Sequence, residues 1–405
     1  MLKKIPVDDL RVGMHLHELC GSWMEHPFWR TKFVIRDPKD LRRIVDSGIQ
    51  EVWIDVAKGF DVAAGAMREE VDDAVDQALL ATAIRVEAPK QVSFAEEVQR
   101  ATKICAKSKQ AVVFMFQEVR MGKAISADAA SALVEDISSS VQRNPGALIS
   151  LARLKTADDY TYMHSVAVCA LMVSVARQLG LNESETREAG MAGLLHDLGK
   201  ALIPAKVLNK PGRLTDAEFD IMKTHPEAGH RILLEGGTVG DIPLDVCLHH
   251  HEKIDGSGYP HRLKDKQISQ FAKIGAVCDV YDAITSNRPY KAGWDPAESI
   301  RRMAEWCKGH FDETIFQAFV KSIGIYPVGS LVRLKSDRLA VVLEQSPESL
   351  LTPRVKAFFS TRALTYIQPE IIDLARPSCP ETIASREDAA KWDIRNVDDY
   401  WISAT

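Results

Sequence analysis

A histidine and an aspartate are adjacent at positions 196 and 197, and a lysine follows at position 200. An imidazole beside a carboxylate suits a divalent metal site, because the imidazole binds one ion and the carboxylate oxygens can bridge two. His196 and Asp197 come at the end of a helix predicted to begin near Asn182. Helical spacing would turn Lys200 toward the same site.

Histidine is concentrated around this pair, since eight of the 12 histidines lie between residues 164 and 261. The candidates for further metal ligands are His164, His225, the run His249-His250-His251, and Asp279. Five of these histidines and the two aspartates would leave open positions on two six-coordinate ions. Two ions about 3.5–4 Å apart bind the attacking and leaving oxygens in phosphoryl chemistry. The set therefore predicts a dinuclear hydrolytic site. Because it contains no cysteine, it is better suited to a site for iron, manganese or zinc than to a structural zinc site of the cysteine type.

Two further motifs could contact a substrate. The segment Asp255-Gly256-Ser257-Gly258-Tyr259-Pro260 predicts a loop with close backbone approach and one aromatic side chain. The segment Arg288-Pro289-Tyr290-Lys291 places two cations where they could hold phosphate oxygens. Taken alone, the first motif would be an ordinary turn and the second a solvated helix end.

The elements that must position these residues are predicted to be mainly helical. Residues 126–325 follow a helical pattern, with capping boxes beginning at Asn182 and Thr215. Residues 1–125 combine short β-prone runs with a helical connector, which predicts an α+β domain. Residues 326–405 contain short β-prone runs that predict a small β-rich appendage. The expected fold class is therefore mainly α, with a helical catalytic domain between two smaller regions.

The composition of the 405-residue chain is that of a globular protein, and its net charge of −5 argues against a generic binder of polymeric nucleic acid. The longest nearly apolar run, Val166–Ala176, is too short to span a bilayer, so we expect no membrane insertion. Seven cysteines without a C-x-x-C pair, and no signal peptide, fit a reducing cytoplasm. Residues 62–110 could form a packing or dimer helix, which leaves a homodimer or a signalling-protein partner open.

Together these motifs resemble the HD-GYP family of cyclic-dinucleotide phosphodiesterases over roughly residues 155–325. The motifs that carry the resemblance, in chain order, are His164, His196-Asp197, Gly199-Lys200, His225, His250-His251-Glu252, Gly258-Tyr259-Pro260, Asp279-Val280-Tyr281-Asp282 and Thr285-Ser286-Asn287-Arg288-Pro289-Tyr290-Lys291. The first 60 or so residues, with Leu10-Arg11-Val12-Gly13-Met14 and His26-Pro27-Phe28-Trp29, resemble a domain of unknown function that often precedes this catalytic domain.

The resemblance implies an HD-type helical domain with a set of seven metal ligands. They are His164, His196, Asp197, His225, His250, His251 and Asp279. Asp197 would bridge two divalent ions, for which we expect iron or, alternatively, manganese. His249 is one histidine more than the family pattern needs, so we assign it a supporting role. Some members bind a third metal through a glutamate where this chain has Tyr160, so we expect two ions.

The resemblance also implies the reaction. Lys200 and Asp197 would be the catalytic residues, with Lys200 near the scissile phosphate. Gly258 and Tyr259 would shape the substrate pocket, and Arg288 and Lys291 would bind phosphate. The expected activity is hydrolysis of cyclic di-GMP to linear pGpG in bacterial second-messenger signalling, with further hydrolysis to GMP left open.

Three alternatives to this activity stay open at the level of sequence. A preference for 3′,3′-cyclic GMP-AMP would depend on base contacts that the motifs do not reveal. A non-catalytic module that only binds a cyclic dinucleotide is disfavoured, because no ligand position is missing. A broader HD-type phosphohydrolase of mononucleotides would explain His196-Asp197, but not the loop at residues 255–260.

Overall fold

The computed structural model describes residues 1–21, 32–82, 92–155, 160–212, 214–237, 239–287 and 293–402. The motif His26-Pro27-Phe28-Trp29 and the predicted phosphate ligands Arg288 and Lys291 lie outside the described residues, as does the side chain of Tyr160. The chain forms two compact units, Met1–Leu80 with Ala304–Lys308, and Ala81–Met303 with Gly309–Thr405.

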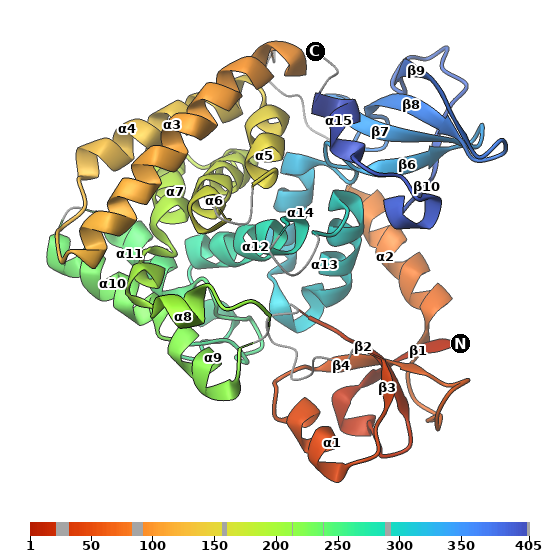
Figure 1. Cartoon of the computed structure of the whole chain (residues 1–405), viewed down its shortest axis with the longest axis horizontal. Helices are drawn as coiled ribbons and strands as arrows, with labels where there is room; N and C mark the ends of the chain where they lie inside the picture. Colours follow the sequence, from red (N-terminus) through yellow and green to blue (C-terminus); the bar gives the residue numbers. More distant parts are fainter. Residues whose placement is uncertain are drawn as a thin grey trace. The chain divides into compact units, whose positions relative to one another are not determined.

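The first unit contains a five-stranded sheet in the order β3-β2-β4-β1-β5, with helix α1 beside it (Figure 1). Its elements are β1 (Leu2–Pro6), β2 (His15–Leu19), β3 (Phe33–Val34), α1 (Pro38–Val45), β4 (Glu51–Asp55), β5 (Ala66–Met67) and the start of α2 (Arg68–Thr82). The central strands β1 and β4 run antiparallel, and Ile5 and Ile54 are buried in the core of this sheet. This unit has the α+β character that the sequence predicts for residues 1–125, but the helix Phe94–Arg120 of that range belongs to the second unit.

The second unit is a bundle of helices. Its helices are α3 (Phe94–Arg120), α4 (Ala127–Arg143), α5 (Pro145–Arg153), α6 (Tyr160–Gln178), α7 (Glu183–Leu195), η3 (Leu198–Leu202), α8 (Ala205–Leu208), α9 (Asp216–Met222), α10 (His225–Gly236), α11 (Asp241–His249), α12 (Gln270–Thr285), α13 (Pro296–His310) and α14 (Glu313–Ile323). The capping boxes predicted at Asn182 and Thr215 begin α7 and α9.

Two helices at the centre of this bundle, α6 and α12, are enclosed by others (Figure 1). The apolar run Val166–Ala176 makes up most of α6 and is buried along its whole length. Helix α12 is also buried on nearly all sides from Ala272 to Thr285. Such helices leave little water for a polar side chain, so any histidine or aspartate on them needs partners within the protein.

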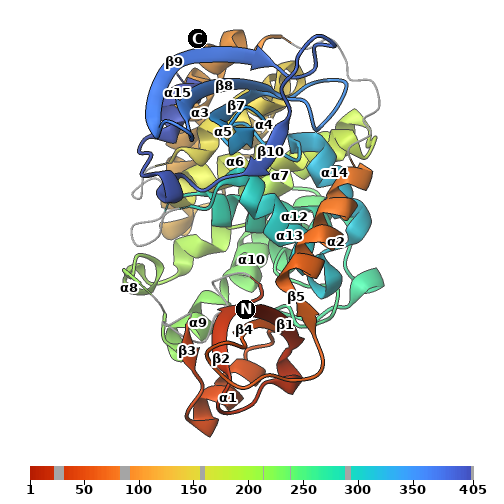
Figure 2. The same cartoon turned by 90° about the vertical axis from the view of Figure 1, so that its right-hand side faces the viewer.

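The C-terminal region is a second five-stranded sheet, in the order β10-β6-β7-β8-β9, with β9 at one edge (Figure 2). Its elements are β6 (Leu331–Leu334), β7 (Arg338–Glu344), β8 (Arg354–Ser360), β9 (Thr365–Asp373), β10 (Ile383–Arg386) and α15 (Val397–Ile402). Alternate residues of β7 face two cores: Leu339 and Val341 pack with the helical bundle, and Ala340 and Val342 pack within the sheet region. This burial on both faces explains why β7 is an almost continuous apolar run.

The predicted fold class, a mainly helical protein with small α+β and β-rich regions at its ends, is confirmed. The predicted boundaries at residues 125 and 325 stay predictions.

A buried ion pair joins α3 to α4. The Glu97 side chain is fully buried and accepts hydrogen bonds from Arg143 at 2.7 and 2.8 Å and from Ser140 at 2.7 Å. Burial by itself would raise the pKa of Glu97, but the hydrogen bonds from Arg143 and Ser140 lower it below its ordinary value.

We predict that Glu97→Gln lowers the free energy of unfolding at pH 7 by about 1.5–3 kcal/mol, the value of a hydrogen bond to a charged group. Because the folded-state pKa of Glu97 is depressed, its contribution is complete above the unfolded-state pKa and is lost as the pH falls through the folded-state pKa. Urea unfolding should therefore show a smaller difference in the free energy of unfolding between wild type and Glu97→Gln at acidic pH than at pH 7. The exposed neighbour Glu96→Gln is the control, and an equal loss in both variants would contradict the assignment.

Candidate metal centre

Side chains from five helical segments of the second unit meet at one buried site. They are His164 on α6, His196 and Asp197 after α7, His225 at the start of α10, His250 and His251 after α11, and Asp279 on α12. The potential ligand atoms form two groups, and within each group all of them lie within 4.8 Å of one another. Asp197, His225, His250 and His251 form one group, and His164, His196 and Asp279 form the other. All seven residues that the sequence proposes as ligands are thus brought together, and their role as ligands stays a prediction.

A close backbone contact at Gly199 positions two of these segments. A Cβ atom on Gly199 would lie 1.9 Å from the carbonyl oxygen of His225, so only glycine lets η3 approach the start of α10. This approach brings Asp197 Oδ1 to 3.2 Å from His225 Nε2. The sequence pattern predicts a glycine at a helix end here, but not its contact with a segment 26 positions later.

Hydrogen bonds to the backbone orient three of the imidazoles. His196, His225 and His250 each donate from Nδ1 to the carbonyl oxygen of a residue three or four positions earlier, at 2.8, 2.8 and 3.0 Å. A carbonyl can only accept, so Nδ1 carries the hydrogen and the lone pair of Nε2 points into the site. This arrangement is the usual one for histidines that bind metal ions.

The site also has acceptors that lack a donor. The Nε2 atoms of His225 and His250 lie 3.2 Å apart although both carry lone pairs. Asp197 Oδ1 and Asp279 Oδ2 are buried and accept no hydrogen bond from the described part of the chain. Opposed lone pairs and orphaned carboxylate oxygens are costly unless a cation lies between them, so these residues fit a metal site.

The protonation states of His250, His251 and Asp197 match this requirement, and that of His164 differs. Burial alone would lower the pKa of His164, but hydrogen bonds with Asp197, Asp279 and Asp282 raise it to about 10. Burial, with the nearby imidazoles of His196 and His225, lowers the pKa of His250 to about 3, and burial holds the pKa of His251 well below its usual value. Burial alone would raise the pKa of Asp197, but Lys200 and the surrounding histidines hold it well below its ordinary value. Neutral imidazoles and ionised carboxylates are the forms that bind metal ions.

A second layer of side chains lies behind His164. Asp282 Oδ2 accepts a hydrogen bond from His164 Nδ1 at 2.6 Å, and both Asp282 oxygens contact Lys155 Nζ. Asp282 follows Asp279 by three residues on α12. This spacing places both side chains on one face of the helix, so the sequence could have predicted that Asp282 lies near the site. No pattern in the sequence links Lys155 to the site.

Lys200 lies at the edge of the cluster, as its helical spacing predicts. Its Nζ is 2.5 Å from Asp197 Oδ2, and its side chain keeps 19% of its surface exposed. The cation therefore contacts a proposed metal ligand and remains accessible to a substrate.

The loop at residues 255–260 also reaches the cluster. The Tyr259 ring stacks on His251, with centroids 4.6 Å apart and planes inclined by 26°. A Cβ atom on Gly258 would lie 2.5 Å from the backbone of Glu252, so the loop passes against this residue. The buried Glu252 carboxylate accepts the backbone N–H groups of His261 and Leu263 at 2.7 and 2.9 Å and so anchors the loop.

His249 is outside both ligand groups. Its Nδ1 is 2.8 Å from Asp245 Oδ1, and its Nε2 lies 3.1 Å from His261 Nδ1. These contacts connect the end of α11 with the residue that follows Pro260.

Fold and site together define an HD-domain protein. Family models match the chain at residues 2–130, described as a domain of unknown function (DUF3391), and at residues 137–315, described as an HD domain. Cyclic di-GMP phosphodiesterase PA4108 of Pseudomonas aeruginosa is 54% identical over 402 residues, which cover 99% of this chain and 96% of that protein. The chain belongs to the HD-GYP family of HD-domain phosphodiesterases, which confirms the resemblance seen in the sequence.

Other relatives match a smaller share of the chain. The cyclic di-GMP phosphodiesterase response regulator RpfG of Xanthomonas campestris is 50% identical over 122 residues, which cover 30% of this chain and 32% of that protein. The 3′3′-cGAMP-specific phosphodiesterase 1 of Vibrio cholerae is 32% identical over 164 residues, which cover 40% of this chain and 38% of that protein. Among the described residues, no helix is long and apolar enough to cross a membrane.

We predict that Asp197→Asn removes at least half of the bound metal, because the variant loses a buried negative charge that contacts both ligand groups. Elemental analysis of anaerobically purified protein measures this loss. His230→Gln, at a half-buried histidine outside both ligand groups, should keep the wild-type metal content. Equal metal content in Asp197→Asn and wild type would contradict the assignment.

Proposed function

We propose that this protein is a metal-dependent phosphodiesterase that hydrolyses cyclic di-GMP to linear pGpG, and in a second step could yield GMP. The observation that carries the proposal is the buried cluster of five histidines and two aspartates, with the accessible cation of Lys200 at its edge. The identity to cyclic di-GMP phosphodiesterase PA4108 over nearly the whole chain supports the same activity.

We propose that two divalent ions bind, most often iron and alternatively manganese. The two ligand groups would each hold one ion, and Asp197 would bridge them. Its position supports this role, since Oδ1 lies 3.2 Å from His225 Nε2 in one group and Oδ2 lies 3.3 Å from His164 Nε2 in the other. When bound, such a pair supplies Lewis acidity and lowers the pKa of water. Imidazole and carboxylate ligands without sulfur suit iron and manganese.

The chain's own residues would bind and orient the substrate around this pair. Lys200 would lie near the scissile phosphate, where its ammonium group could protonate the departing 3′ oxygen or stabilise its charge. Tyr259, held flat against His251, and Gly258 would form a wall of the substrate pocket. On the basis of the sequence resemblance alone, we propose that Arg288 and Lys291 bind phosphate.

A preference for 3′,3′-cyclic GMP-AMP is the second candidate, favoured by the similarity to 3′3′-cGAMP-specific phosphodiesterase 1. Competition between the two dinucleotides on one metal-loaded sample decides between them. Tight binding without turnover would instead favour the non-catalytic module, and release of phosphate from mononucleotides would favour the broader phosphohydrolase.

We also propose a cytoplasmic location and a homodimer or signalling-protein partner. All seven cysteines are free thiols, which fits a reducing compartment. The net charge of −5 supports the exclusion of polymeric nucleic acid as a partner.

We predict that Lys200→Met lowers kcat for cyclic di-GMP by about 10²–10⁴-fold, the usual contribution of a positioned acid or base. Chromatography of pGpG formed by metal-loaded protein measures the rate, and elemental analysis verifies the metal content. Lys206→Met, at an exposed lysine, is the matched control and should react at the wild-type rate. A wild-type kcat in Lys200→Met would contradict its role, and a metal-loaded wild type that leaves cyclic di-GMP and 3′,3′-cyclic GMP-AMP intact would contradict the proposed function.

A further inference from the structure

A buried lysine that belongs to none of the sequence motifs lies behind the candidate metal centre. Lys155 Nζ is 2.6 Å from Asp282 Oδ1 and 2.5 Å from Asp282 Oδ2, and its side chain has no exposed surface. Asp282 in turn accepts a hydrogen bond from His164 Nδ1 at 2.6 Å. The three side chains thus form a continuous line from the protein interior to a proposed metal ligand.

The geometry of this line determines how His164 faces the site. Because Asp282 holds Nδ1, the opposite ring nitrogen, Nε2, points at the carboxylates of Asp197 and Asp279, at 3.3 and 3.0 Å. A carboxylate that contacts an ammonium group through both oxygens has little freedom to rotate. The orientation of the imidazole therefore depends on a contact that Lys155 makes with Asp282.

Charge gives a second reason for a lysine at this place. Asp282 is the third buried carboxylate around His164, after Asp197 and Asp279. A buried carboxylate is costly without a cation, and Lys155 offsets its charge through contacts with both of its oxygens. The contact with Lys155 thereby keeps Asp282 ionised next to His164. An ionised carboxylate can only accept a hydrogen bond, so His164 must donate from Nδ1.

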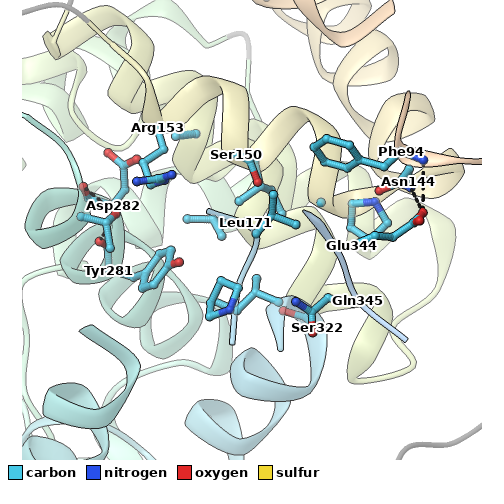
Figure 3. Close-up of a pocket in the computed structure, with 18 residues that line it drawn as sticks. Phe94, Asn144, Ser150, Arg153, Leu171, Tyr281, Asp282, Ser322, Glu344 and Gln345 are labelled. Atoms are coloured by element: carbon cyan, nitrogen blue, oxygen red, sulfur yellow. Dashed lines mark hydrogen bonds between the residues drawn. The ribbon is translucent and has the colours of Figure 1, made fainter. Parts of the chain in front are cut away.

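A cavity of about 40 Å³ borders Asp282 on a further side (Figure 3). Arg153 and Tyr281 lie near Asp282 at one end of it, and Glu344 and Gln345 lie at the other. A cavity of this size has room for a few water molecules but not for a nucleotide. Water there could hydrate Asp282, but it could not supply the positive charge that Lys155 provides.

We infer that Lys155 is a positioning residue for the metal centre: it holds Asp282 so that His164 presents Nε2 to the ion bound by His164, His196 and Asp279. This inference rests on the proposed function, because it presupposes two metal ions. His164 belongs to one ligand group and not to the other. Loss of Lys155 should therefore weaken the binding of one of the two ions selectively.

The test compares metal content after dialysis against a competing chelator. Wild type should retain two equivalents, and Lys155→Met should retain about one, because a lost outer contact typically weakens metal affinity by about 10–100-fold. The matched control is Lys273→Met, which removes a largely buried ammonium from α12 that pairs with Asp265 and Asp312, both outside the ligand groups. It should retain two equivalents.

A double-mutant cycle with Asp282→Asn tests whether Lys155 acts through Asp282. The double variant Lys155→Met/Asp282→Asn should lose no more metal than the more affected single variant, whereas additive losses in affinity would overturn the inference. Circular dichroism of the metal-free variants verifies folding. If Lys155→Met does not fold, Asp282→Asn alone is compared with wild type. An unchanged metal content in Asp282→Asn then overturns the inference.

The outcomes separate the inference from the proposed function. Two equivalents in wild type and two in Lys155→Met, with equal affinities, overturn the role of Lys155 and leave the dinuclear site in place. Fewer than two equivalents in wild type overturn the dinuclear site, and the inference with it.

Discussion

The structure depends on one electrostatic constraint: imidazoles and carboxylates from five helical segments face one another at a place that excludes water. His225 and His250 direct lone pairs at each other, and Asp197 and Asp279 each keep a buried oxygen to which no described residue donates a hydrogen bond. In a site without a cation these contacts oppose folding. The surrounding helices must therefore hold the residues together firmly enough to keep the site ready for its ions.

Several features of the fold serve this purpose. Helices α6 and α12 are buried nearly all round, so that the ligands on them are fixed by packing. Gly199 lets η3 lie directly against α10, and backbone carbonyls one turn earlier orient three of the imidazoles. The packing and the Gly199 contact determine where the ligands lie, and the backbone hydrogen bonds determine where three of the ring nitrogens point. A metal ion requires both.

The sequence reveals the ligands more readily than the contacts that support them. His196-Asp197 and His250-His251 are visible because adjacent metal-binding residue types are uncommon in a buried core, and the capping boxes at Asn182 and Thr215 mark helix starts through local hydrogen bonds. Lys155 and Gly199 act on residues distant in the chain, and no local pattern encodes such contacts. Glu252 is visible as part of a motif, but its role as the anchor of the following loop appears only when its backbone partners are located.

The central claim is that two ions, held in two ligand groups that share Asp197, are both required for hydrolysis. Stepwise anaerobic titration of the metal-free protein with ferrous iron, with cyclic di-GMP turnover measured at each step, tests it directly. We expect turnover to rise mainly with the second equivalent and to reach its plateau at two. Full turnover at one equivalent, or none at any loading, would contradict it.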